Sequence, residues 1–292
     1  MAARKRRWGD RKEGRLLRSL DPFTKFTPFI MAQRNDATNS FQDTFCIDRT
    51  EKYIRQKREE GLKGFGMMHI FIASYIRTAS QYPAINRFVS GQRIYARNNI
   101  EVVLTVKHEM STESGETTIK AYFEPTDTAE DVYRKMNEKI DEVKGDAEDN
   151  GTEKAAAIFG KLPRLLLRFV IGLIKLLDYF GKVPQALLAV SPFHGSMIIT
   201  NLGSLGIKPI YHHIYNFGNL PVFIAFGTKR KENELQPDGS IETRRYMDFK
   251  VNMDERICDG FYAAKALKLM KRVMSNPWEL DHAPETVVED VD

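Results

Sequence analysis

The sequence predicts an α+β fold, and three observations lead to this class. Alternating or continuous apolar runs predict strands at residues 41–47, 93–97, 100–106, 117–123, 196–201, 222–227 and 242–253. Apolar residues at helical spacing predict helices at residues 50–60, 67–82, 128–144 and 261–275. The two kinds of segment do not alternate regularly along the chain, which favours α+β over a doubly wound parallel fold.

Local signals set the limits of these elements. The run Asp48-Arg-Thr-Glu51 places an N-cap candidate three residues before an acid, and it opens the first helix. Gly61 to Gly66 ends that helix, and Pro83 ends the next one. Between the last two strands, residues 228–241 are charged and contain a Pro-Asp-Gly turn signal, which predicts a loop connection.

Composition indicates a soluble globular protein of the cytoplasm. The 292 residues are 42% apolar and 28% charged, which is ordinary for a folded domain with a sizeable core. The two cysteines, Cys46 and Cys258, are far apart and lack metal-ligand spacing. This pattern favours a reducing compartment over a disulfide framework, and it predicts no metal site. No secretory signal is visible at the N-terminus.

The net charge of +5 is unevenly spread over the chain. Residues 1–20 carry eight Lys or Arg and form a predicted basic arm. Such an arm can meet nucleic acid or anionic lipid, but a solvated, partly disordered arm is the preferred interpretation. Nucleic acid is set aside because no other stretch interleaves basic and aromatic residues. Residues 281–292 form a predicted acidic tail.

The segment 155–190 is an apolar, amphipathic stretch. Its charges Arg164, Arg168, Lys175 and Asp178 fall along one narrow stripe of a helix whose remaining circumference is apolar. Charges inside the segment argue against a membrane-spanning helix. Two interpretations stay open: a helix lying in the plane of a membrane, or a helix buried against the protein's own body or a partner, which is preferred.

The run Asp254-Glu-Arg-Ile-Cys-Asp-Gly260 lies between the last strand and the last helix. An acid beside a glycine at such a turn presents side chains at a sheet edge, where chemistry is often done. A second turn, Leu202-Gly-Ser-Leu-Gly206, follows the buried strand that ends in Thr200-Asn201. Its Gly-x-x-Gly spacing alone is a weak phosphate signal, because no helix is predicted behind it.

Together, four stretches resemble the catalytic domain of the 2-oxoacid dehydrogenase dihydrolipoyl acyltransferases, which shares the chloramphenicol acetyltransferase-like fold. The resemblance covers most of residues 30–280 and implies one acyltransferase-like domain at 21–280, with a two-layer mixed sheet and helices. The stretches are 46–50, 68–106, 196–206 and 254–277.

The resemblance implies transfer of an acyl group between coenzyme A, as a substrate, and a thiol or hydroxyl acceptor. In the family a histidine is the general base, a Ser or Thr hydroxyl stabilises the oxyanion, and the site forms between subunits of a homotrimer. By position, Thr200 matches the oxyanion donor, Asp259 matches a structural aspartate held by ionic contacts, and Glu255 stands where the histidine is expected.

A glutamate carboxylate is a weaker base than an imidazole by about two pKa units, so Glu255 is the main departure from the family. His212 and His213 follow the Thr200 turn and are candidates to replace the base. The alternative is that this pair packs or forms an interface. His194, just before the Thr200 strand, is a weaker candidate.

Three functional hypotheses follow from these residues. The first is an acyl-CoA-dependent acyltransferase with an altered base, and the second is a non-catalytic trimeric scaffold. The third is a membrane-surface acyltransferase that acts on a lipid or amphiphile. Segment 155–190 supports the third, since family members have only a short connection there, and it also offers a membrane or partner contact. No lipoyl domain or Pro/Ala-rich linker is visible, so the chain does not resemble a complete dehydrogenase-complex acyltransferase.

Overall fold

The computed structural model describes residues 5–107, 116–145 and 159–292. The first residues of the predicted arm (1–4) and of the apolar segment (155–158) therefore lie outside it. Its helices are α1 (Pro22–Ile30), α2 (Asp48–Glu59), α3 (Met67–Gln81), α4 (Ala129–Gly145), α6 (Arg164–Tyr179), α7 (Gln185–Val190) and α8 (Gly260–Ser275). Its strands are β1 (Gly14–Leu16), β2 (Thr38–Cys46), β3 (Arg87–Ser90), β4 (Arg93–Arg97), β5 (Ile100–Lys107), β6 (Glu116–Phe123), β7 (Met197–Asn201), β8 (Val222–Leu235) and β9 (Ile241–Asp254).

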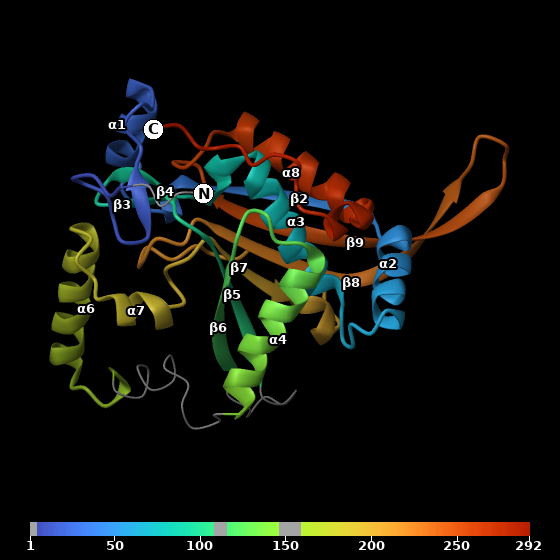
Figure 1. Cartoon of the computed structure of the whole chain (residues 1–292), viewed down its shortest axis with the longest axis horizontal. Helices are drawn as coiled ribbons and strands as arrows, with labels where there is room; N and C mark the ends of the chain where they lie inside the picture. Colours follow the sequence, from blue (N-terminus) through green and yellow to red (C-terminus); the bar gives the residue numbers. More distant parts are fainter. Residues whose placement is uncertain (1–4, 108–115, 146–158) are drawn as a thin grey trace.

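A large mixed sheet organises the molecule (Figure 1). Its strand order is β2-β9-β8-β7-β5-β6; β7 is parallel to both of its neighbours and the other pairs are antiparallel. A small antiparallel sheet, β1-β4-β3, lies apart from it. Helices α3 and α8 pack against each other and against the large sheet. The α+β class with a mixed sheet is confirmed.

The main core lies between the large sheet and helices α3 and α8. Helix α3 is apolar around most of its circumference, so it is buried on nearly all sides. Phe71 of α3 stacks on Phe226 of β8 with ring centroids 4.5 Å apart, and its ring also meets Phe45 and Phe249 edge-on. These aromatic contacts join β2, β8 and β9 to the helix layer.

His69 near the start of α3 is a packed core histidine. Its Nδ1 accepts a hydrogen bond from the Gly66 N–H at 3.0 Å, and its ring stacks on Phe65. The side chain is buried, and burial lowers the pKa of His69 to about 4. The folded protein therefore holds this imidazole neutral at pH values where an unfolded chain protonates it.

The neutral His69 predicts a loss of stability on acidification. Because its folded pKa lies below the unfolded value, His69 should lower the free energy of unfolding by up to about 3 kcal/mol as pH falls from about 6.5 to about 4. His69→Gln, which can keep the bond to Gly66, should remove this part of the pH dependence in urea denaturation series. The exposed His282→Gln is the control, and a His69→Gln profile that parallels it would contradict the prediction.

The opposite face of the large sheet carries a second, smaller apolar cluster. It contains Val103, Ile198, Ile214, Leu220 and Phe223. The chain between β7 and β8 supplies Ile214 and Leu220, so this connection covers the face. Side chains alternate along a strand, and Thr200 therefore points to the same face as Ile198, while Ile199 points into the main core.

The two chain ends are tied to one another. Residues 14–16 of the basic segment pair with β4, and Arg15 donates to the backbone carbonyls of Asp290 and Val291. Arg87 of β3 holds the Asp290 carboxylate with two hydrogen bonds. The preferred interpretation of a solvated arm is wrong for residues 9–20, most of which are buried or half-buried, whereas residues 5–8 are exposed. Arg15 bonds the acidic tail, and Arg11 and Lys12 bond the carbonyls of Tyr179 and Val183.

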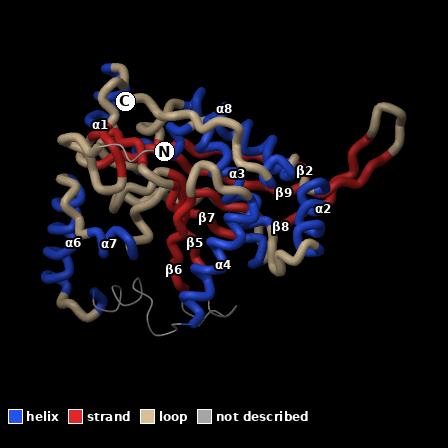
Figure 2. Tube along the Cα trace, in the orientation of Figure 1, coloured by secondary structure: helices blue, strands red, loops and turns tan. Residues whose placement is uncertain are grey.

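The predicted loop at 228–241 is instead part of a long hairpin. β8 and β9 remain paired from Lys229↔Met247 to Leu235↔Ile241, beyond a bulge that follows Phe226. This ribbon projects from the body in Figures 1 and 2. Its charged residues face solvent on both sides, so the alternation of apolar residues that marks a half-buried strand is missing from the sequence.

The described part of the apolar segment, 159–190, contains α6 and α7. Only Ile174 of α6 is buried, and large apolar side chains on the outward side are exposed. The prediction that this helix is buried against the protein's own body is therefore wrong for most of the surface of α6. The body covers only one narrow side of the helix. Among the described helices, none has the length and hydropathy needed to cross a bilayer.

Candidate functional site

A buried ion triad lies at the end of β9, where the motif 254–260 begins. The Asp254 carboxylate is fully buried and receives two hydrogen bonds from Arg256, at 2.7 and 2.8 Å. Arg34, which precedes β2, approaches the same carboxylate with Nε at 3.2 Å. Burial lowers the pKa of Arg34, and the adjacent Asp254 carboxylate opposes that effect.

The remaining donors of the two arginines hold backbone carbonyls. Arg34 bonds the carbonyls of Tyr215 and Gly218, in the connection between β7 and β8. Arg256 bonds those of Met31 and Ala32, just after α1. Because these donors have oxygen partners, the triad fixes two distant segments, residues 31–34 and 215–218, to the end of β9.

Glu255 and Asp259 of the motif have different surroundings. The Glu255 N–H donates to the Ala37 carbonyl at 2.7 Å, but its half-buried carboxylate has no polar partner among the described residues. Asp259 is exposed and caps α8, because its carboxylate accepts the Tyr262 N–H at 2.7 Å. Among the described residues of one chain Asp259 makes no ion pair, whereas Asp254 pairs with two arginines. Burial raises the pKa of the Cys258 thiol to about 12, which keeps it protonated.

Within one chain, the structure does not bring Thr200 close to Glu255. Thr200 is level with Ala225 of β8 and, through it, with Lys250 of β9. Glu255 lies five residues beyond Lys250, or about 16 Å along the strands, and two strand spacings, about 10 Å, across them. A single subunit therefore presents the two residues at separate places.

His212 lies on the same sheet face as Thr200. Its ring stacks on Phe223 with centroids 4.1 Å apart, and its backbone N–H donates to Asn252 Oδ1 at 3.0 Å. Asn252 in turn donates to Ser40 Oγ at 2.8 Å. Burial and the neighbouring His213 lower the pKa of His212, so its imidazole is neutral and able to accept a proton at neutral pH.

His213 and His194 are placed differently. His213 is exposed and packs edge-on against Tyr215 with centroids 4.8 Å apart. His194 is buried, with Nδ1 at 2.8 Å from Ser191 Oγ and Nε2 at 3.5 Å from the Asp178 carboxylate of α6. His194 thus links α6 to the chain before β7.

Several polar residues of this region were not predicted from the sequence. Arg34 and Asn252 carry no local motif, and only the fold brings them to Asp254 and His212. Lys120 of β6 is buried beside Glu101 at 3.6 Å, and burial lowers the pKa of Lys120 to about 8. In the sequence, Lys120 stands on the face of an alternating strand that does not join the core. A lysine at such a position is also expected of a strand with one face in solvent, so the sequence does not mark Lys120 as buried.

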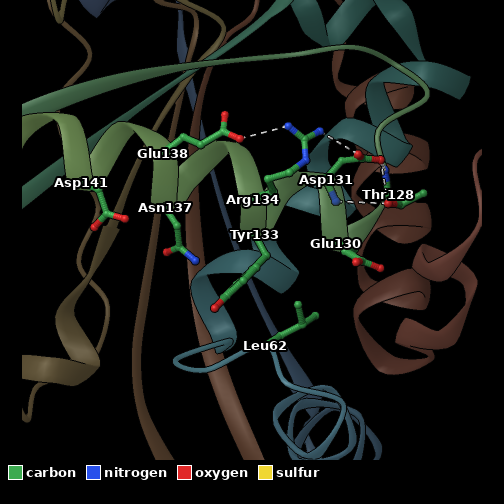
Figure 3. Close-up of a pocket in the computed structure, with 9 residues that line it drawn as sticks. All are labelled: Leu62, Thr128, Glu130, Asp131, Tyr133, Arg134, Asn137, Glu138 and Asp141. Atoms are coloured by element: carbon green, nitrogen blue, oxygen red, sulfur yellow. Dashed lines mark hydrogen bonds and ion pairs between the residues drawn. The ribbon is translucent and has the colours of Figure 1, made fainter.

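A surface hollow of about 490 Å³ runs along α4, away from these residues (Figure 3). Leu62 and α4 side chains line it, and Arg134 is paired there with Asp131 and Glu138. None of the predicted site residues lines this hollow. The described residues contain no cluster of His, Cys, Asp and Glu able to hold a metal ion.

The α+β fold, with its mixed sheet and helices, is of the chloramphenicol acetyltransferase-like type. Residues 176–281 match the family model "2-oxoacid dehydrogenases acyltransferase (catalytic domain)", so this part of the chain carries that family's sequence signature. The match includes both Thr200 and the 254–260 motif. No curated protein matches the chain.

Solved structures agree on the fold across nearly the whole chain. A probable dihydrolipoamide acetyltransferase from Listeria monocytogenes superposes with a TM-score of 0.56 at 14% identity, over 92% of this chain and 95% of that one. The cubic core of a pyruvate dehydrogenase multienzyme complex gives 0.52 at 12% identity, over 94% and 95%. The Azotobacter vinelandii dihydrolipoamide acetyltransferase, studied for the roles of a serine, a histidine and an asparagine in its catalytic mechanism, gives 0.50 at 10% identity, over 90% and 93%.

Proposed function

We propose that this protein transfers an acyl group between coenzyme A and a thiol or hydroxyl acceptor, in a site formed between subunits of a trimer. The observation that carries the proposal is the placement of the two signature elements. Thr200 and Glu255 lie within the family match, yet they are about 19 Å apart in one chain by strand geometry. This separation within one chain fits a site between subunits, in which one subunit supplies Thr200 and its neighbour supplies the 254–260 turn.

The Azotobacter enzyme supports the assignment of the turn. The histidine and asparagine studied in its mechanism are four residues apart, as Glu255 and Asp259 are here. In our proposal Asp259 shapes the turn by capping α8, and Asp254 with its two arginines holds the turn in place. Glu255 then projects from a rigid support, which is what a residue facing a neighbouring subunit requires.

The reaction proceeds by attack of the acceptor on the thioester carbonyl. A base removes the proton of the acceptor thiol or hydroxyl as its sulfur or oxygen bonds to the carbonyl carbon. The Thr200 hydroxyl donates a hydrogen bond to the oxyanion of the tetrahedral intermediate. The intermediate collapses, the carbon–sulfur bond to coenzyme A breaks, and the leaving thiolate takes up the proton held by the base.

Two residues are candidates for the base. Glu255 occupies the family position, and its carboxylate has no polar partner among the described side chains. His212 lies on the sheet face of Thr200 and has a lowered pKa, which keeps a neutral imidazole available. His213, exposed against Tyr215, and the buried His194 are less well placed for this role.

Single substitutions at these positions should identify the base. If Glu255 is the base, Glu255→Gln should lower kcat/KM for acetyl-CoA with a small dithiol acceptor by about 10²–10⁴-fold, and Glu255→His should restore or raise it. If His212 is the base, His212→Gln should cause the loss and Glu255→Gln should not. His213→Gln is the matched control, because it removes an exposed neighbouring imidazole.

A non-catalytic trimeric scaffold is the second candidate, and the glutamate at the base position favours it. For a scaffold, coenzyme A should cause no thermal shift and Glu255→His should create no turnover. Light scattering, which measures the oligomer mass, tests both candidates, because each of them requires a trimer. A monomer would remove the intersubunit site on which the proposed acyl transfer depends.

A further inference from the structure

Helix α6 is attached to the rest of the protein by its C-terminal end. The Asp178 carboxylate meets His194, and the Asp178 carbonyl accepts a bond from Ser90 Oγ at 3.0 Å. The Tyr179 carbonyl accepts from Arg11, and its hydroxyl donates to Gln92. No other described helix or strand packs extensively on α6, which stands at the edge of the molecule in Figure 1.

Three different surfaces run along α6. One side contains buried Ile174 and faces the body. The side directly opposite holds Leu165, Phe169 and Leu176, which are 81%, 68% and 54% exposed. Between them runs a stripe of exposed cations, Arg164, Arg168 and Lys175. The sole acid of the helix, Asp178, points to His194, so the outward charges of α6 are all positive.

The outward apolar surface continues onto α1 and the basic segment. Phe29 of α1, Trp8 and Phe180 are all strongly exposed, and Trp8 reaches 89%. These three residues line one hollow of about 930 Å³ together with cationic side chains that include Arg6 and Lys182. We call the outward surface of α6, with this hollow and exposed α1, the α1–α6 face.

We propose that the α1–α6 face binds the surface of an anionic lipid bilayer, with α6 lying in the membrane plane. Apolar and aromatic side chains can enter the boundary between headgroups and acyl chains, while the flanking cations meet lipid phosphates. A second copy is a poorer occupant, because two α6 helices paired antiparallel about a two-fold axis bring their cationic stripes to the same side of the pair. This binding is independent of the proposed acyl transfer.

Flotation of the full chain with vesicles tests the proposal. Vesicles of phosphatidylcholine and phosphatidylglycerol in about a 2:1 ratio should bind the protein at least about tenfold more tightly than pure phosphatidylcholine, and binding should weaken in about 0.5 M salt. Phe169→Glu combined with Leu173→Glu should reduce binding about tenfold or more. The fluorescence of Trp8 should shift to the blue when the protein binds vesicles. Trp278, the other tryptophan, is half-buried in the fold and also contributes to the emission.

The matched control changes exposed apolar residues elsewhere. Leu235→Glu combined with Ile241→Glu alters the tip of the β8–β9 ribbon, where these side chains are 76% and 69% exposed. It should bind vesicles like the native protein. The proposal fails if both variants lose binding equally or if neutral and anionic vesicles bind alike. It also fails if the α6 variant binds vesicles normally but changes the oligomer mass, since a second copy then occupies the face.

Discussion

Asp254→Asn is expected to destabilise the protein by about 3–5 kcal/mol, the largest effect we foresee on folding. The substitution leaves the guanidinium groups of Arg34 and Arg256 buried next to each other without the carboxylate that both now contact. Removing one partner of a buried ion pair costs more than the pair contributes, because the remaining charge stays desolvated. Urea denaturation followed by circular dichroism measures the change.

Glu255→Gln is a matched control for that experiment. The two acids are adjacent, but the Glu255 carboxylate has no polar partner among the described residues. Its substitution should change the free energy of unfolding by no more than about 0.5 kcal/mol. If the two substitutions change the free energy of unfolding equally, the triad does not hold the end of β9. The proposal that Asp254 and its two arginines fix the 254–260 turn would then be wrong.

Thr200→Val is expected to reduce kcat by about 10²–10³-fold while leaving stability nearly unchanged. The substitution keeps the shape and β-branching of the side chain and removes only the hydroxyl. That hydroxyl has no hydrogen bond in the described structure, so its loss leaves no polar group unpaired in the folded state. Turnover with acetyl-CoA and thermal unfolding, measured side by side, separate the catalytic effect from a structural one.

Thr200→Ser provides the comparison, because it keeps a hydroxyl at the same place on β7. It should retain most of the activity that the valine variant loses. A valine variant as active as the native protein would remove Thr200 from the oxyanion site. Loss of activity in the serine variant as well would indicate that packing of the β-branched side chain, and not the hydroxyl, matters at this position.

The sequence predicted the elements of the core well, because burial leaves a direct pattern in the chain. Helix α3 and strand β7 are largely apolar, and the structure places them within one or two residues of their expected limits. The Asp254-to-Gly260 turn was likewise found between strand and helix. These features depend on local periodicity and turn chemistry, which single-sequence reasoning captures.

The remaining features depend on partners that are distant in sequence. The paired strands of the β8–β9 ribbon are solvated, so their sequence resembles a charged loop. Arg34 has no local signal, and its role is set by Asp254. Residues 5–20 resemble a free arm until the acidic tail is placed beside them. For the same reason, no local pattern in the sequence marks Asp254 as the acid that pairs with two arginines.

The order of strands in the large sheet has a consequence for synthesis of the chain. Strand β2 pairs with β9 along its whole length, and Arg34 and its carboxylate partner are 220 residues apart. The ribosome therefore releases β2 well before its neighbour exists, and its edge stays unpaired in the nascent chain. Pairing over such a separation is slow. Strand β2 is thus a natural place for chaperones to act while translation continues.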